Sequence, residues 1–424
     1  MPFTTIAFCL LLATAFSARA AEAAPDAPDD AGALELADRT PTATEQARTW
    51  RLYAEAAASR GWARGPYTGG DGLRGSLDFR YDGSLASGLR GVLSDRLDVV
   101  HDDARSDERT VNVLREAYLS WQARPDLIVD LGRVNVRNGV AWGYNPTDFF
   151  RAGALRSIVS LDPACLRENR LGTVVVQAQK LWRDSSFSAL VSPKLASTPS
   201  DESFSLDLGS TNPRNRWLLA ASHKFSEGFN PQLLLHGGED TPTQAGANLS
   251  GLLNKSTVAF LEFSSGKGRS LRAQTLGLAE SERWQRRTAL GLTVTTSFNL
   301  SMTAEADFNT AAPERAQWDA LTAGNPPAAL LLLQTAQTLQ ELPVRRAAFF
   351  YATWRDLLVR RLDLSGFLRH DLVTHSRQQW LELRYHWQRA EVALQWQLYS
   401  GSANSVYGSV PQKESAQLSA RFFF

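Results

Sequence analysis

The chain has 424 residues, a formal net charge of +1 and two cysteines. A charge this close to zero argues against a nucleic-acid partner. Only Cys165 lies beyond the N-terminal region, which excludes an internal disulfide framework. Apart from a short run at the N-terminus, no stretch approaches the about 18 consecutive apolar residues of a membrane-spanning helix.

The N-terminal region has the features of a secretory signal peptide. The apolar run from Ile6 to Leu12 is too short to span a bilayer, and Ala18-Arg19-Ala20 fits a cleavage site. We predict a signal peptide at 1–20 and an exported mature chain. Residues 21–48 are rich in Ala, Pro and Asp and predict a flexible periplasmic segment, with a small plug as the alternative.

From Trp50 to the end, the sequence alternates between apolar and polar residues in runs of about ten. This two-residue period predicts strands, each with one apolar and one polar face. The last run shows it well, because Leu418, Phe422 and Phe424 fall on one face and Gln417 and Arg421 on the other. The predicted strands are 50–59, 73–81, 88–98, 110–121, 126–132, 172–182, 186–192, 216–225, 229–237, 244–252, 256–264, 286–297, 299–309, 345–355, 359–369, 376–387, 390–400 and 413–424. The count is eighteen, with sixteen as the main alternative.

Two further patterns indicate a transmembrane antiparallel β-barrel at 49–424. Connections after even-numbered strands are short, whereas those after odd-numbered strands vary and include the longest, as in barrels with periplasmic turns and external loops. An even strand count then places both termini in the periplasm. Most even strands also end on an aromatic residue of the apolar face, which predicts an aromatic belt at one membrane interface: Tyr81, Trp121, Trp182, Phe225, Trp354, Trp387 and Phe424.

The last residue, Phe424, resembles the C-terminal aromatic residue of bacterial outer-membrane barrels. That resemblance implies the outer membrane as the location, its lipid as the surroundings, and the barrel-assembly machinery as a partner. A second, looser resemblance lies at Leu114-Arg115-Glu116-Ala117-Tyr118, Leu131-Gly132-Arg133 and Trp142-Gly143-Tyr144-Asn145-Pro146-Thr147-Asp148. It is similar to the pattern of porin-like and alginate-export-like outer-membrane proteins, over roughly 114–182. It implies a porin-type barrel with an inserted loop and names no substrate.

The aromatic ends fix which side chains of each strand point into the lumen. Guanidinium groups that face carboxylates across a wet pore produce a transverse field and an ion preference. The alternative is that they are ordinary ion pairs within the wall. The predicted pore-lining residues are Arg51, Arg74, Arg80, Arg90, Arg96, Arg369, Arg384, Arg421, Glu116, Glu305, Asp307 and Glu382.

Two long connections are candidates for narrowing an eighteen-stranded pore. Residues 133–171 are long for a structureless connection and are expected to fold inward. The predicted constriction residues of this loop are Trp142, Tyr144, Asn145, Asp148, Arg151 and Arg156. The second connection, 310–344, contains a predicted apolar helix from Ala328 to Leu342, whose leucines need burial in the barrel mouth or against a partner.

Local motifs for catalysis or for cofactor binding are missing from the sequence. None of the six histidines falls in H-E-x-x-H, and no nucleophile elbow or Gly-rich phosphate loop occurs. We therefore predict no metal, no cofactor and no enzyme activity. The predicted function is passage of small or anionic solutes or polymers across the outer membrane, by diffusion or by export with a periplasmic partner. The alternatives are a non-conducting scaffold or surface-exposed binding protein and, less favoured, an outer-membrane hydrolase.

Overall fold

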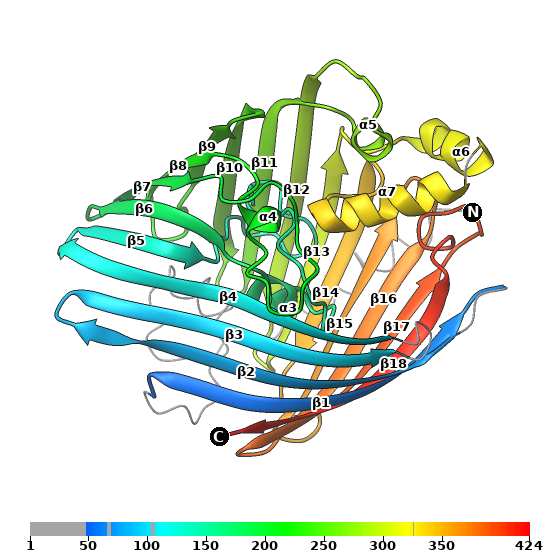
Figure 1. The fold of residues 1–424 in the computed structure, drawn as a ribbon, viewed down its shortest axis with the longest axis horizontal. Coiled ribbons are helices and arrows are strands. Elements are labelled where there is room, and N and C mark those ends of the chain that lie inside the picture. Colours follow the sequence, from blue (N-terminus) through cyan, green and yellow to red (C-terminus); the bar gives the residue numbers. More distant parts are fainter. Residues whose placement is uncertain (1–47, 66–68, 103–106, 325) are drawn as a thin grey trace. The chain divides into compact units, whose positions relative to one another are not determined.

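The computed structural model describes residues 48–65, 69–102, 107–324 and 326–424. The predicted signal peptide 1–20, and the predicted segment 21–48 except for its last residue, lie outside the described residues. Each strand pairs antiparallel with its neighbours in sequence, and β18 pairs with β1, so the sheet closes into a barrel (Figure 1). The predicted count of eighteen strands is confirmed.

The elements follow the predicted order along the chain. The strands are β1 (Trp50–Ala63), β2 (Asp71–Ala86), β3 (Leu89–Asp102), β4 (Asp107–Arg124), β5 (Leu127–Val134), β6 (Thr173–Leu181), β7 (Ser185–Ser192), β8 (Arg216–His223), β9 (Gln232–Gly238), β10 (Thr241–Asn254), β11 (Thr257–Gly268), β12 (Arg283–Thr295), β13 (Leu300–Asn309), β14 (Arg346–Trp354), β15 (Leu362–Asp371), β16 (Arg377–His386), β17 (Ala390–Ser400) and β18 (Gln412–Phe423). The helices are α3 (Pro163–Glu168), α4 (Leu208–Thr211), α5 (Leu271–Leu276), α6 (Arg315–Gly324) and α7 (Pro326–Leu339). None of the helices in the described ranges is long and apolar enough to cross a membrane.

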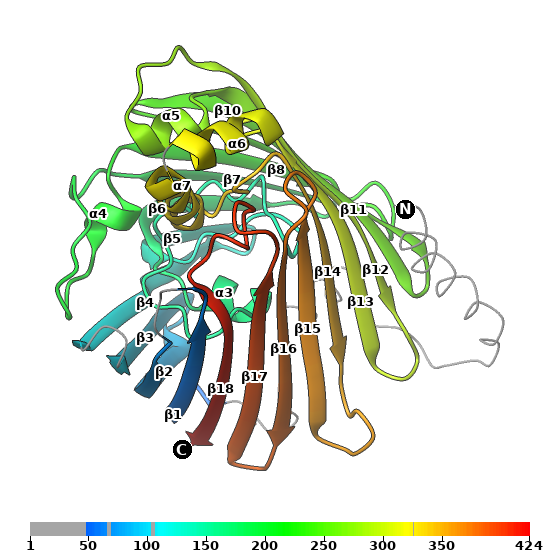
Figure 2. The same cartoon turned by 90° about the vertical axis from the view of Figure 1, so that its right-hand side faces the viewer.

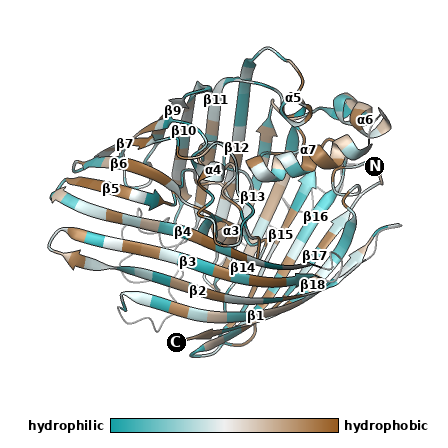
Figure 3. Cartoon of the chain, in the orientation of Figure 1, coloured by the Kyte–Doolittle hydropathy of each residue, from teal (hydrophilic) through white to brown (hydrophobic). Residues whose placement is uncertain are grey.

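Apolar and polar residues alternate along the strands (Figure 3), and large apolar side chains of the strands are exposed, as the alternation predicts. Trp121, Trp182 and Trp387 are 52–55% exposed, and Phe424 is 55% exposed. Trp354 packs beside Phe298, with ring centroids 5.8 Å apart. These aromatic rings lie at the same ends of their strands, as a membrane-interface belt requires.

The two ends of the barrel differ in their connections. Even-numbered strands lead into turns at one end, here called the turn end, where β4 and β5 are joined by only Pro125 and Asp126. Odd-numbered strands lead into the other end, here called the loop end, which carries the connections containing α3 to α7 (Figure 2). One connection at the loop end is short, since β9 and β10 are separated only by Glu239 and Asp240.

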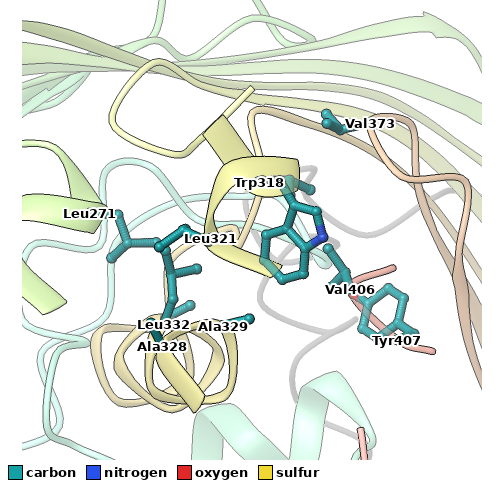
Figure 4. Close-up of a cluster of buried hydrophobic side chains, with 11 residues drawn as sticks. Leu271, Trp318, Leu321, Ala328, Ala329, Leu332, Val373, Val406 and Tyr407 are labelled. Carbon is teal, nitrogen blue, oxygen red and sulfur yellow. The ribbon is translucent and has the colours of Figure 1, made fainter. Parts of the chain in front are cut away.

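Three helices of the loop end, α5, α6 and α7, share one buried apolar cluster. Trp318 of α6 is fully buried between Leu332 of α7, Leu271 of α5 and Val406 of the β17–β18 connection (Figure 4). Its indole Nε1 donates a hydrogen bond to the Asn404 carbonyl oxygen at 2.7 Å. The predicted apolar helix is therefore α7. Its Leu332 is fully buried in this cluster and Leu333 and Leu339 pack against it, whereas Leu331 is 44% exposed.

Candidate pore and constriction

The inner face of β1–β4 and β16–β18 carries a network of arginines and carboxylates, here called the arginine wall. Glu55 of β1 lies at its centre and accepts from Arg74 at 2.7 Å, from Arg96 at 2.9 Å and from Arg421. Arg421 belongs to β18, so this cluster lies on the pair of strands that closes the barrel. Charge-assisted bonds of this kind are stronger than neutral ones and hold the side chains in one arrangement.

Arg115 joins this wall because of a β-bulge. The pairing of β3 with β4 shifts between Ser94 and Asp95, so Arg115 becomes an extra residue that has no partner on β3. Its Nη2 donates to Asp78 Oδ1 at 2.7 Å, and its Nη1 donates to Asn169 of the inward loop at 2.6 Å. Sequence reasoning missed Arg115, because strict alternation assigns it to the face opposite Glu116.

The remaining predicted wall residues are also paired or stacked. Their contacts are Arg80 with Glu116 at 2.8 Å, Arg90 with Asp82 at 2.5 Å, Arg384 with Glu382 at 2.8 Å and with Glu391 at 2.9 Å, and Arg51 over the Tyr53 ring at 5.9 Å. Ion pairs within the wall, the alternative considered from the sequence, are therefore present throughout it.

Within these pairs the guanidinium group is the more accessible partner. The Arg421 side chain is 20% exposed and that of Glu55 is 1% exposed. The Arg80 side chain is 36% exposed and that of Glu116 is 13% exposed. The arginine side chains of this wall are therefore more exposed than the carboxylate side chains that they contact, although the pairs are nearly balanced in number.

Residues 135–172, here called the inward loop, cross the lumen from one wall to the other. On the arginine wall, the Val159 carbonyl oxygen accepts from Arg74 and from Gln417 of β18, each at 3.4 Å. Ser157 donates to Asp98 Oδ2 of β3 at 2.8 Å. The helix α3 of this loop lies inside the ring of strands in both views (Figures 1 and 2).

On the opposite side, two buried carboxylates hold the backbone of the inward loop. Glu262 of β11 accepts from the backbone N–H groups of Val140 and Ala141, the latter at 2.8 Å. Glu305 of β13 accepts from the N–H groups of Trp142 at 2.5 Å and Gly143 at 2.9 Å. Four consecutive backbone N–H groups thus donate to two buried carboxyl groups. We call this arrangement the carboxylate latch.

The predicted constriction residues surround this latch. Trp142 stacks on Tyr351 of β14 with ring centroids 5.3 Å apart, and Asn145 donates to Glu262 at 3.3 Å. Gly143 packs so closely on Phe349 that an added Cβ would lie 2.5 Å from its ring, so only glycine fits at this position. Arg369, predicted to line the pore, donates to the Gly143 carbonyl oxygen at 2.7 Å.

Glu341 connects the inward loop to the connection that carries α7. It accepts from Tyr144 at 2.5 Å, from Arg151 at 2.8 Å and from Arg287 of β12 at 2.9 Å. The two arginines keep the pKa of the buried Glu341 carboxyl below its usual value, although burial acts in the opposite direction. Sequence reasoning missed Glu341, because the predicted apolar helix extended to Leu342 and included it. In the structure α7 ends at Leu339, and Glu341 follows it.

The other predicted loop residues bind protein groups rather than pointing into open space. Asp148 pairs with Arg170 at 2.6 Å within the inward loop. Arg156 lies away from the constriction and donates to the carbonyl oxygens of Ser205, at 2.8 Å, and Glu202 in the β7–β8 connection.

Asp307 of β13, which was predicted to line the pore, is buried instead. It is 3% exposed, and neither of its carboxylate oxygens has a hydrogen-bond partner among the described residues.

Asp162, just before α3, is a titratable group of the inward loop whose pKa is shifted by its surroundings. It accepts from Tyr351 at 3.0 Å and caps α3 by accepting from the Ala164 N–H at 3.3 Å. Burial, together with the nearby Glu382 carboxylate, raises the pKa of Asp162 to about 6. Burial also raises the pKa of the neighbouring Cys165 thiol to about 11. The described residues include no cluster of His, Cys, Asp and Glu suited to a metal ion.

Comparisons with known proteins agree with this architecture. No protein-family model and no curated protein sequence matches the chain. Solved structures that resemble it include Acinetobacter baumannii OccAB1, with a TM-score of 0.58 at 9% identity, covering 88% of this chain and 96% of that one. Pseudomonas aeruginosa OccK2 (OpdF) has a TM-score of 0.54 at 11% identity, with coverages of 88% and 97%. Pseudomonas aeruginosa OccK5 (OpdH) has a TM-score of 0.53 at 9% identity, with coverages of 88% and 98%.

At such low identity the likeness concerns the fold. The match extends over nearly the whole length of both chains, so it includes the full ring of strands. The chain has the same fold as these Acinetobacter and Pseudomonas proteins, and in this chain it is a closed antiparallel β-barrel of eighteen strands.

Proposed function

We propose that the protein is a porin-like channel of the bacterial outer membrane that passes small hydrophilic solutes and prefers anions. The proposed orientation in the membrane places the turn end and both termini in the periplasm and the loop end outside the cell. The apolar exterior suits lipid, whereas the inner face carries arginines and carboxylates. The structural neighbours are porins of the Occ/OprD family, which supports the same class of activity.

The preference for anions rests on a single observation, the unequal exposure of the paired charges in the arginine wall. Arginines such as Arg80 and Arg421 are more exposed than the carboxylates that they contact. On the opposite wall, Glu262 and Glu305 are buried beneath the inward loop. The field at the accessible surface is therefore more positive than the net charge of the protein suggests.

The experiment is a reversal-potential measurement in planar bilayers with a salt gradient. Arg51 and Arg80 are chosen because they are more exposed than Arg96, which is 2% exposed and belongs to the network around Glu55. The double variant Arg51→Gln/Arg80→Gln should conduct, with its reversal potential shifted toward cation selectivity. The shift should shrink as salt rises, because the Debye length falls from about 10 Å at 0.1 M to about 3 Å at 1 M.

A matched control is Arg283→Gln/Arg286→Gln, which removes two exposed arginines at the loop end of β12. This variant should keep the reversal potential of the wild type. An identical reversal potential in wild type and in the Arg51/Arg80 variant would contradict the anion preference. A protein that never conducts would instead support a non-conducting scaffold.

A further inference from the structure

The lipid-facing surface of β13–β17 contains a groove of about 690 Å³. Its floor is Gly366 of β15, which pairs with Ala352 on one side and with Leu381 on the other. A Cβ at Gly366 would lie 2.9 Å from the Trp380 carbonyl oxygen, so a side chain does not fit there without a shift. The missing side chain leaves a hollow in an otherwise continuous apolar wall.

Aromatic side chains on neighbouring strands stand on either side of this hollow. Phe350 of β14 is 43% exposed, and Trp396 of β17 is 53% exposed. Leu368 and Leu398 continue the lining toward the loop end. The groove is therefore long, apolar and open to the membrane, a shape that suits a hydrocarbon chain through many weak dispersion contacts.

Three basic residues lie beyond the loop end of the groove, next along the strands after its lining residues Leu368 and Gln379. His370 of β15 pairs with Arg377 of β16, and Arg346 begins β14 on the same outward face as Phe350. Arg346 and Arg377 are exposed, and neither has an ion-pair partner among the described residues. The His370 Nδ1–H donates to the Ser376 carbonyl oxygen at 3.1 Å, which leaves Nε2 as the second polar atom of the ring.

The height of these cations matches a membrane boundary. Eight residues separate Trp354, in the aromatic belt, from Arg346 in the same strand. This is a rise of roughly 27 Å along the strand, or about 21 Å along the membrane normal at a strand tilt of about 40°. The long side chain of Arg346 can extend from there to the edge of an apolar band of about 25 Å. Glu414 also lines the groove, but it belongs to β18 and pairs with Leu398, on the side away from Arg346. We therefore expect an anionic group to bind near β14–β16, away from the Glu414 carboxylate.

We propose that this groove binds a phosphorylated lipid of the outer leaflet, with one acyl chain over Gly366 and a phosphate against Arg346, His370 and Arg377. The inference rests on the orientation given under Proposed function, in which the loop end faces outward. Guanidinium groups suit phosphate, since they offer several donors in one plane. A second copy of the barrel fits less well, because a two-fold contact at this face would bring the same cations together.

The test uses the full-length barrel in a non-ionic detergent, with lipid A and dephosphorylated lipid A as probes. Native mass spectrometry reports how much of each lipid is retained. Wild type should retain lipid A at least about tenfold more than the dephosphorylated form, a typical preference where several cations contact a phosphate. Arg346→Gln/Arg377→Gln should remove this preference, and Ala352→Phe, which fills the groove, should reduce retention of both lipids.

Two matched variants serve as controls. Ala56→Phe adds the same ring at an exposed outward position on β1, and Arg283→Gln/Arg286→Gln removes two loop-end arginines from β12. Both should bind lipid as wild type does. Equal lipid binding in all variants would overturn the proposal, and so would an oligomer that Ala352→Phe dissociates, which would assign the groove to contact between barrels.

The lipid site and the proposed channel function can be tested separately. Wild type and folded groove variants should show the same conductance in planar bilayers, because the groove lies on the outer surface. A wild-type barrel that conducts normally but retains lipid A and dephosphorylated lipid A equally would contradict the lipid site alone. A non-conducting barrel that still selects lipid A would contradict the channel alone.

Discussion

Glu55 illustrates how a single residue organises the arginine wall. Its carboxylate is 1% exposed and contacts three arginines, two of them from strands that border β1 in the closed sheet. A carboxylate buried to this extent is costly unless it is fully paired, and here each oxygen accepts from a guanidinium group. Of the three arginines, Arg421 keeps 20% of its side chain exposed, whereas Arg96 is buried in the network.

Asp162 gives the residue-scale prediction. Because the pKa of this carboxyl is raised to about 6, the folded loop binds its proton more tightly than the unfolded chain does. The inward loop should therefore be most stable below about pH 4, and should lose up to about 3 kcal/mol as the pH rises through 6. Asp162→Asn keeps a side chain that can cap α3 and removes the charge. The stability of the inward loop in this variant should therefore not fall as the pH rises.

Cys165 reports on this effect, because it lies in α3 next to Asp162 and is the single cysteine of the described residues. The measurement is the rate of thiol labelling in wild type and in Asp162→Asn at the same pH. Dividing the first rate by the second removes the pH dependence that comes from ionisation of the thiol itself. This ratio should rise between pH 5 and pH 8. A constant ratio would mean that Asp162 does not destabilise the loop when it is charged.

At the scale of elements, the strands are defined by which face meets lipid. Leu394 of β17 is 50% exposed on the apolar face, where it pairs with Leu383 and Leu418. Leu394→Arg should cost about 2–4 kcal/mol, because it places a charge in the apolar band. The measurement is the fraction of heat-modifiable folded barrel on a gel. The control Leu358→Arg changes a residue that is 91% exposed in a turn and should fold normally. Equal folding of both variants would contradict the outward assignment of Leu394.

The strands could be predicted because a two-residue period appears directly in the sequence. Trp121, Trp182 and Trp387 fixed both the face and the end of each strand, so the strand order and the inward arginines followed from them. A bulge breaks this rule, and for that reason Arg115 was not predicted to join the wall. The contacts of the inward loop are long-range, as between Val140 and Glu262, and no local pattern encodes them. The functional roles of the predicted pore residues stay predictions.

At the scale of the whole molecule, a closed ring of eighteen strands is wide enough to leave an aqueous channel unless something fills it. The inward loop occupies that space and is bound to both walls, through Val159 on one side and the carboxylate latch on the other. Glu341 further ties it to the connection that carries α7. The conductance of the protein should therefore depend on how firmly this loop is held.

The most direct test is the single-channel conductance of Glu262→Ala/Glu305→Ala, which removes the carboxylate latch and leaves the barrel strands intact. Wild type should form a narrow channel, and the variant should conduct at least about twofold more because its constriction is loosened. Glu280→Ala, which removes a partly exposed carboxylate in the β11–β12 connection, is the matched control and should conduct as wild type does. Equal conductance in the latch variant and wild type would contradict a constriction formed by the inward loop.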